Sequence, residues 1–348
     1  MLGALVAIVV ALVVKVPFFS MRGLHMFGVL HLIYVDLVVL LPAMGMAVLA
    51  WGWFDPRLGP VRRLTTQARI AAWSSLMAVG VGIYATYIEP ARLQLETATI
   101  DVDPARVGRE ALRIAILSDI QLERVTDYER QAVERLLALR PDVIVMPGDV
   151  FQGTARRFED EVGHLRELLG RLDAPGGVFL VRGDVDWNDD HVHRMVQGTR
   201  IRLLENEVVR TNVRDRRITI GGVELNYGSN AAQAVVRQLE DTAGTDEIRI
   251  LLGHRPDVAL GLRERSRIDM VLAGHTHGGQ VVIPFYGPPI TLSSVPRRVA
   301  AGGLHRINDN LIYVSRGVGC ERGQAPRVRF LCPPEISLVT VGGGSAKR

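Results

Sequence analysis

Long uninterrupted runs of apolar residues distinguish the first ninety residues of the chain from the rest. Leu2–Val14 is continuously apolar, and longer apolar stretches cover Met26–Trp53 and Ile70–Ile88. The second and third stretches reach the ~20 residues needed to cross a bilayer, and the first does so when residues 16–19 are included. A signal peptide is the alternative for the first stretch, but the expected small-residue cleavage site is missing. The pattern predicts a membrane anchor of three transmembrane helices over residues 1–90.

The charges between the apolar stretches predict how this anchor is oriented. Four arginines, at positions 57, 62, 63 and 69, separate the second stretch from the third, against the single acid Asp55. Short loops rich in Lys and Arg stay in the cytoplasm, so this loop is expected there. The chain after Ile88 is then expected on the extracytoplasmic side of the cell membrane. His31 and Asp36, within the second stretch, are better explained as helix–helix contacts than as a polar pathway.

From residue 91 onward, short apolar runs alternate with amphipathic ones. Alternation over 97–107 is typical of an edge strand, and apolar runs predict strands at 111–117, 143–146 and 177–181. Helices are expected at 128–140, capped by Asp127, and at 158–172 and 231–241. The remaining strands are expected at 201–204, 208–211, 218–220, 223–225, 248–252, 268–273, 280–283, 311–314 and 336–341. The pattern predicts an α/β domain over residues 91–341 and a disordered tail at 342–348.

Polar side chains follow the carboxyl ends of several of these strands. They are Asp119, Asp149, Asp184, Asp186, His254, His275 and His277. Ligand sites in open α/β sheets form at the carboxyl ends of the strands, so these groups are expected to lie together. His275 and His277 have i, i+2 spacing, which on an extended backbone points both side chains the same way. Carboxylate and imidazole ligands without thiolates suit Mn, Fe, Zn or Mg.

Composition narrows the classes of function. The 348 residues have a net charge of only +4, and the arginines are scattered, so no nucleic-acid partner is expected. A mean hydropathy of +0.17 is high for a purely soluble protein. The only cysteines, Cys320 and Cys332, are too few for a four-cysteine zinc site, although one disulfide could join them in an oxidising compartment. Any metal must therefore be held by His and Asp.

The order of the motifs resembles the calcineurin-like metallophosphoesterase superfamily, in particular its membrane-anchored bacterial branch. The family's signature is D-x-H, G-D, G-N-H-D/E, G-H and G-H-x-H, and the sequence GHTHGGQ closes the series here at Gly274–Gln280. Pro284, Tyr313–Gly317 and Pro333–Glu335 extend the similarity, which covers about residues 112–341. The resemblance implies an α/β sandwich of two mixed sheets flanked by helices, preceded by the three transmembrane helices.

Carried over residue by residue, the resemblance implies one or two divalent metal ions (Mn, Fe, Zn or Mg) and their ligands. The first ion would be held by Asp119, Gln121, Asp149 and His277. The second would be held by Asp149, Asp184, His254 and His275. Asp186 and His254 are the expected catalytic residues, Asp186 because it matches the acid that orients the family's catalytic histidine.

Three positions depart from the family's pattern. Gln121 replaces a histidine ligand, Asp184 replaces a metal-binding asparagine, and Val185 replaces the catalytic histidine. An amide oxygen is a weaker ligand than imidazole for the later transition metals, whereas the added charge of Asp184 should strengthen the second site. Valine cannot donate a proton, and a missing general acid costs about 10²–10⁴ in rate. His191 and His193 could substitute, although exposed loop positions explain them more simply.

Two functions remain open. The first is a membrane-anchored phosphoesterase that hydrolyses a phosphomonoester or phosphodiester with metal-activated water. Its place near lipid headgroups makes a phospholipid or lipid-linked phosphate a reasonable substrate. The second is a catalytically impaired pseudoenzyme that binds metal and a phosphorylated ligand or partner. The retained His and Asp residues favour metal binding, and the loss of two family histidines favours impaired catalysis.

Overall fold

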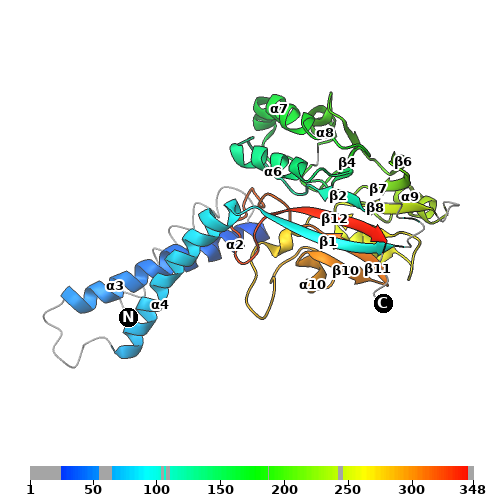
Figure 1. Cartoon of the computed structure of the whole chain (residues 1–348). Coiled ribbons are helices and arrows are strands. Elements are labelled where there is room, and N and C mark those ends of the chain that lie inside the picture. The colour runs from blue at the N-terminus through cyan, green and yellow to red at the C-terminus, as the bar shows by residue number, and fades with distance from the viewer. Residues whose placement is uncertain are drawn as a thin grey trace. The chain divides into compact units, whose positions relative to one another are not determined.

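The chain folds into two compact units in a computed structural model that describes residues 25–54, 65–102, 106, 110–186, 188–241 and 246–343. The helical unit comprises Met1–Glu89 together with Glu321–Val328. The α/β unit comprises Pro90–Cys320 and Arg329–Arg348. Figure 1 shows the elements of both.

Two apolar helical runs make up most of the described part of the helical unit. The first joins α2 (Met26–Val35), the π-helical turn η1 (Asp36–Leu40) and α3 (Leu41–Phe54), and the second joins α4 (Thr66–Ile83), η3 (Tyr84–Ile88) and η4 (Glu89–Ala91). Met26–Trp51 and Thr66–Ala91 are each long enough and apolar enough to cross a membrane. A Cβ at Gly45 would lie 2.0 Å from Ser75 Oγ, so glycine lets α3 and α4 approach closely. Of the three expected spans, these are the second and third, while Leu2–Val14 lies outside the described residues.

Two six-stranded mixed sheets form the α/β unit. The first has the order β1 (Gln94–Val102), β12 (Glu335–Gly343), β2 (Leu112–Ile116), β3 (Val143–Met146), β4 (Val178–Leu180) and β5 (Ile201–Leu203). The second has the order β10 (Gly303–Ile307), β11 (Asn310–Val314), β9 (Met270–Ala273), β8 (Glu247–Leu252), β7 (Arg216–Gly222) and β6 (Glu207–Val213). Because β2 to β5 are mutually parallel, as are β7, β8 and β9, the carboxyl ends within each set share one edge. The prediction of two mixed sheets is confirmed.

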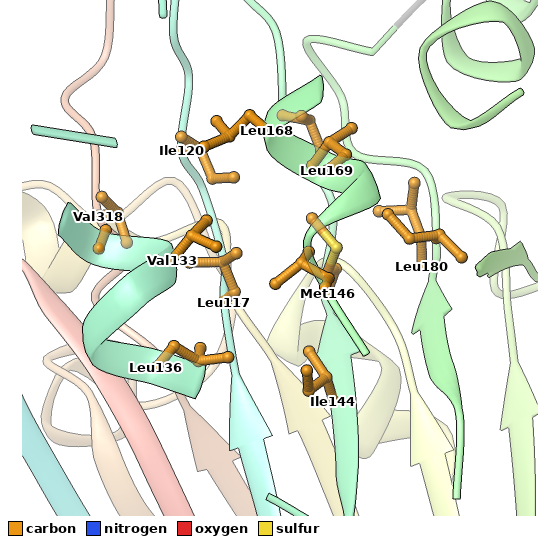
Figure 2. Packing of buried hydrophobic residues seen from close by; sticks show 14 of the residues in the cluster. Leu117, Ile120, Val133, Leu136, Ile144, Met146, Leu168, Leu169, Leu180 and Val318 are labelled. Atoms are coloured by element: carbon orange, nitrogen blue, oxygen red, sulfur yellow. The ribbon is translucent and has the colours of Figure 1, made fainter. Parts of the chain in front are cut away.

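Apolar side chains pack between the sheets and under the helices on their outer faces. Ile114 and Val145 of the first sheet share a buried cluster with Ile220 and Ile250 of the second. The outer face of the first sheet packs against α6 (Asp127–Ala138), α7 (Ala155–Gly170) and α8 (Asp189–Val196), as Figure 2 shows for α6 and α7. The outer face of the second packs against α9 (Asn230–Asp241), η5 (Pro256–Gly261) and α10 (Arg297–Ala300). The sheets are therefore covered on both faces, which fixes the strand ends that carry the site.

A few elements differ from those expected from the sequence. The cap of α6 is Thr126, which forms a capping box with Glu129, so Asp127 is the first helical residue and the predicted cap is wrong. Residues 223–225 are not a strand, and 280–283 pair only through isolated bridges of Val281 and Ile283. α8 and β10 were not expected. In the predicted tail, 342–343 belong to β12 and 344–348 lie outside the described residues.

Candidate metal centre

Short loops after five strands bring carboxylates and imidazoles into one cluster. Asp119, Asp149 and Asp184 follow β2, β3 and β4, while His254 follows β8 and His275 follows β9. Ligand atoms of Asp119, Asp149 and His254 lie within 4.8 Å of one another, and so do those of Asp184, His254 and His275. His254 is fully buried and belongs to both groups. The sheet topology thus gathers side chains that are far apart in sequence.

Several loop residues of the site are held in the left-handed backbone region. They are Asp119 (φ 48°), Gln121 (42°), Asp149 (56°), His275 (72°) and His277 (48°). Such conformations cost energy for non-glycine residues, and they cluster at functional sites. Glycines let the loops approach: a Cβ at Gly274 would lie 2.2 Å from Asp119 Oδ2, and one at Gly183 would lie 2.1 Å from Asp149 Oδ1.

His254 and His275 are each fixed through one ring nitrogen. His254 Nδ1 lies 2.7 Å from the carbonyl oxygen of Pro147, and His275 Nε2 lies 3.1 Å from that of Leu292. Because a carbonyl only accepts, each of these nitrogens carries the proton and the other is an acceptor in the neutral ring. His254 Nε2 faces Asp149 Oδ1 and Asp184 Oδ1 at 3.5 Å each, and His275 Nδ1 lies 3.1 Å from Asp184 Oδ2. This is the arrangement of a metal-binding histidine held by a backbone carbonyl.

Burial and neighbouring charges set the protonation of the cluster. Burial raises the pKa of Asp119 and Asp149. Burial alone would lower the pKa of His254, but Asp149, Asp184 and Asp119 together raise it to about 10. Burial alone would raise the pKa of Asp184, but the neighbouring imidazoles of His254 and His275 outweigh this effect and lower it. Imidazole protons here balance carboxylate charge, a role that a divalent cation would fill more strongly.

Two nitrogen atoms test whether this donor set fits a metal. Among the described residues, the buried Nε2 atoms of His254 and His277 have no hydrogen-bond partner. Buried polar atoms nearly always have one, so these two nitrogens of the site require an explanation. His277 Nε2 lies 4.0 Å from Asp119 Oδ1, and His254 Nε2 faces the other two carboxylates. Divalent ions bound among these carboxylates and imidazoles would give both nitrogens a partner, because each nitrogen would coordinate an ion.

The end of the site around Gln121 and Val185 is built differently. Gln121 is fully buried, and its Nε2 donates to Asp149 Oδ2 at 3.1 Å. Asp186 accepts hydrogen bonds from the backbone N–H groups of Asp149 (2.7 Å) and Gly183 (3.0 Å), among others. Asp186 therefore holds two loops together, whereas the resemblance implied that it orients a histidine. Val185 donates its backbone N–H to Asp149 Oδ1 at 3.0 Å and brings no titratable group.

The two histidines that follow Val185 are placed differently. His191 lines a cavity of about 10 Å³ together with Val185 and Asp186. Its ring stacks on Phe158 with centroids 3.8 Å apart, and burial lowers its pKa. His193 has an exposed side chain whose Nε2 lies 3.8 Å from a carboxylate oxygen of Glu205. Of the two, His191 is the one that shares a cavity with Val185.

Arg255 belongs to the site, although the sequence analysis did not identify it. Its Nη2 and Nε lie 2.7 Å and 3.2 Å from Asp184 Oδ2. The guanidinium thus balances the carboxylate that stands where the family has a neutral asparagine. Its side chain is 42% exposed, so it also faces solvent. The available signal is an arginine directly after His254.

Arg329 is a second residue that was missed, and it is fully buried behind His277. Its guanidinium donates to the backbone carbonyls of Arg316 (2.7 Å) and Gly319 (2.6 Å), and Nη2 lies 3.3 Å from His277 Nδ1. Burial and the charge of Arg329 lower the pKa of His277, which keeps the ring neutral, as a metal ligand must be. No motif in the sequence distinguishes this arginine from the others. Beside it, Cys332, like Cys320, is a buried free thiol, so the possible disulfide is not formed.

One family model and several known proteins are similar to the chain. The model described as calcineurin-like phosphoesterase matches residues 112–279. "Uncharacterized metallophosphoesterase YkuE" of Bacillus subtilis is 30% identical over 281 residues, covering 78% of this chain and 93% of that protein. An "Uncharacterized metallophosphoesterase" of Aquifex aeolicus is 30% identical over 275 residues, covering 77% and 98%. "Transmembrane protein with metallophosphoesterase domain" of Danio rerio is 27% identical over 238 residues, covering 63% of this chain and 51% of that protein.

Proposed function

Because the chain belongs to the calcineurin-like phosphoesterase family, we propose that its α/β unit is a metal-dependent phosphoesterase that hydrolyses a phosphomonoester or phosphodiester. The observation that carries this proposal is the buried cluster in which His254 shares its Nε2 between Asp149 and Asp184. Divalent ions bound there would polarise the phosphoester and supply an activated water. The chain's own residues hold the ions, bind the phosphate and shape the site.

The donor atoms support two metal positions that share Asp149. One would be held by Asp149, Asp184, His254 and His275, three of which form one close group. The other would be held by Asp119, Gln121, Asp149 and His277. Gln121 supplies a neutral amide oxygen to the set that contains Asp119 and His277, so this set should bind its ion more weakly. We therefore expect sequential loading, with the histidine-rich position filled first.

Arg255 supplies positive charge beside Asp184, the residue before Val185. Arginine presents several N–H groups in a planar fork that matches phosphate oxygens. The side chain is paired with Asp184 and partly exposed, so it can remain beside the metal centre while it contacts a substrate phosphate. Since Val185 cannot protonate a leaving group, hydrolysis should favour leaving groups that depart as stable anions. Asp186 acts as a positioning residue for the loop that carries Asp149.

The helical unit supports a membrane location for this activity. Both helical runs are long and apolar enough to cross a bilayer, and one similar protein bears a transmembrane name. We propose a multi-pass protein in which the arginines at positions 57, 62, 63 and 69 face the cytoplasm. The α/β unit then lies outside the cytoplasm. That location favours a lipid-linked phosphate as the substrate.

Val185 and Gln121 favour a second candidate function. A protein that retains the metal ligands but lacks a proton donor could bind a phosphorylated ligand or partner without turnover. The first candidate requires hydrolysis and the second requires only binding, so turnover separates them.

Metal analysis and hydrolysis by the full-length protein in lipid nanodiscs test the proposal. We expect bound Mn, Fe, Zn or Mg by elemental mass spectrometry, and Mn²⁺-dependent hydrolysis of bis-para-nitrophenyl phosphate that His275→Ala abolishes. His164→Ala is the matched control, because His164 is exposed on α7 outside the cluster, and it should keep both properties. Metal retention without any hydrolysis would support the binding protein. Hydrolysis that survives His275→Ala would place the activity elsewhere.

A further inference from the structure

The loop that follows the His275–His277 motif exposes a group of large apolar side chains. We call residues 281–292 the apolar loop. Within it, Ile283 is 46% exposed, Phe285 111%, Tyr286 55% and Leu292 47%. A single exposed apolar residue is ordinary, but several in one loop mark a contact surface.

Backbone hydrogen bonds hold this surface in a defined shape. Gly287 N donates to Ile283 O at 2.9 Å, and Ile283 N donates to Gly287 O at 3.1 Å, which closes a tight turn. Phe285 stands at the tip of that turn with φ 65°, a conformation that bulky residues seldom adopt. At the base, Val282 N donates to Phe330 O at 2.8 Å. The backbone therefore fixes Phe285 in an outward position.

The far end of the apolar loop is attached to the metal centre. The carbonyl oxygen of Leu292 lies 3.1 Å from His275 Nε2. Directly after it, Ser293 Oγ donates to Asp257 Oδ2 at 2.6 Å and Ser294 N donates to Asp257 Oδ1 at 2.8 Å. A partner that binds the apolar loop therefore lies next to the loop that carries His275, a predicted metal ligand.

The charge around the apolar loop limits the kind of partner that the loop can bind. Residues 281–300 include two arginines, Arg297 and Arg298, and no acidic residue. Both arginines are exposed, and Arg297 Cζ lies 4.2 Å from the ring centroid of Tyr286. An apolar tip with an aromatic side chain and adjacent arginines is the composition of an interfacial membrane anchor. Anionic headgroups attract such arginines.

We infer that the apolar loop inserts Phe285 and its apolar neighbours into the interface of an anionic lipid bilayer. Arg297 and Arg298 then lie at the level of the headgroups. Two helices of the same chain are long and apolar enough to cross a bilayer, which supports a bilayer as the surface that this loop binds. Along the sequence, Phe330 is two residues past Val328, the end of the segment that belongs to the helical unit. The inference concerns binding to lipid and does not depend on hydrolysis.

Spin labelling of the full-length protein in nanodiscs tests this inference. Cys320 and Cys332 are buried, so a label directed to Phe285→Cys reacts selectively. The measured quantity is the ratio of the label's collisions with oxygen to its collisions with a water-soluble nickel reagent. In nanodiscs that contain anionic lipid, we expect this ratio to be severalfold higher at position 285 than for a control label at Glu167→Cys. Glu167 lies on α7 with a 65% exposed side chain. Tyr286→Cys provides a second reading in the same turn.

The charge of the headgroups provides a further comparison. Zwitterionic nanodiscs, or the double variant Arg297→Gln and Arg298→Gln, should lower the oxygen-to-nickel collision ratio at position 285. Equal collision ratios at positions 285 and 167 in anionic nanodiscs would overturn the inference. A label at position 285 that is shielded from both reagents would also overturn it, because it would indicate burial against a second copy or another protein.

Discussion

The two ends of the candidate metal centre differ in what the chain supplies to each. At one end, His254 and His275 are each held by a backbone carbonyl and turn the other nitrogen toward carboxylates. At the other end, Gln121 and Val185 stand where the resemblance implies imidazoles. In the proposed site, holding a metal and donating a proton are therefore tasks of different residues. One end can change while the other stays intact.

The altered end keeps its backbone structure because that structure does not depend on a histidine. Asp186 is satisfied by backbone N–H groups, including those of Asp149 and Gly183, so valine at position 185 leaves no buried acid without partners. The extra carboxylate of Asp184 is likewise balanced by Arg255. These substitutions are therefore compatible with a well-packed site, and the property that they impair is catalysis.

Restoring an imidazole at the altered end is the change with the largest expected effect. If the phosphoesterase lacks only a proton donor, Val185→His should raise the turnover of an alkyl phosphodiester by about 10²–10⁴-fold. Activated aryl esters should gain less, because their leaving groups need no proton. The measurement is kcat for both substrates, with Val185→Leu as the control of similar size. Unchanged kcat for the alkyl ester would show that a missing proton donor at position 185 is not what distinguishes the two ends.

Removing ligands one end at a time sharpens the same comparison. His254→Ala should lower the affinity for Mn²⁺ by about 100-fold or more, since even residues around a metal's ligands typically change affinity by 10–100-fold. Gln121→Ala should cost less than about tenfold, because an amide oxygen is a weak ligand. Isothermal titration calorimetry of both variants and of His164→Ala measures the difference. Equal losses in the two site variants would contradict the assignment of a strong and a weak end.

The strand ends of the site could be predicted because they lie at visible breaks in the apolar pattern. β3 occupies residues 143–146, as predicted, and Asp149 follows its last residue closely. The same pattern fails at 280–283, where Val281, Val282 and Ile283 form a loop with only isolated bridges. A short apolar run does not by itself distinguish a buried strand from an exposed apolar loop.

The supporting contacts could not be predicted, because they join residues that are distant in sequence. Arg329 and His277 are 52 residues apart, and the carbonyl that fixes His275 belongs to Leu292, seventeen residues later. Any residue can supply a backbone carbonyl, so no residue type signals it. Arg255 was not predicted either, because its contact with Asp184 depends on how the loops after β4 and β8 lie together.

The smallest expected effect concerns two buried carboxylates of the site, of which Asp149 is shared by both metal positions. Burial raises the pKa of Asp119 and Asp149 above the ordinary value of 3.8. A carboxyl group with a raised pKa stabilises the fold below its unfolded pKa and loses that contribution as the pH rises through its folded pKa. In the presence of a chelator, which removes metal, the free energy of unfolding should therefore decrease as the pH rises from acid toward neutral. A divalent ion, which binds the ionised carboxylates, should restore it.

Thermal unfolding with chelator or with Mn²⁺ measures this difference. At an ion concentration 100 times Kd, binding contributes about 2.7 kcal/mol, which corresponds to a rise in Tm of roughly 5–10 °C for a unit of this size. The rise should be present at about pH 7.5 and smaller at about pH 5, where protons compete for the same oxygens. Asp149→Asn removes the shared carboxylate, so it should abolish most of the metal-dependent rise. An equal rise at both pH values would mean that the ion binds outside the buried carboxylates, and the distinction between the two ends would no longer describe metal binding.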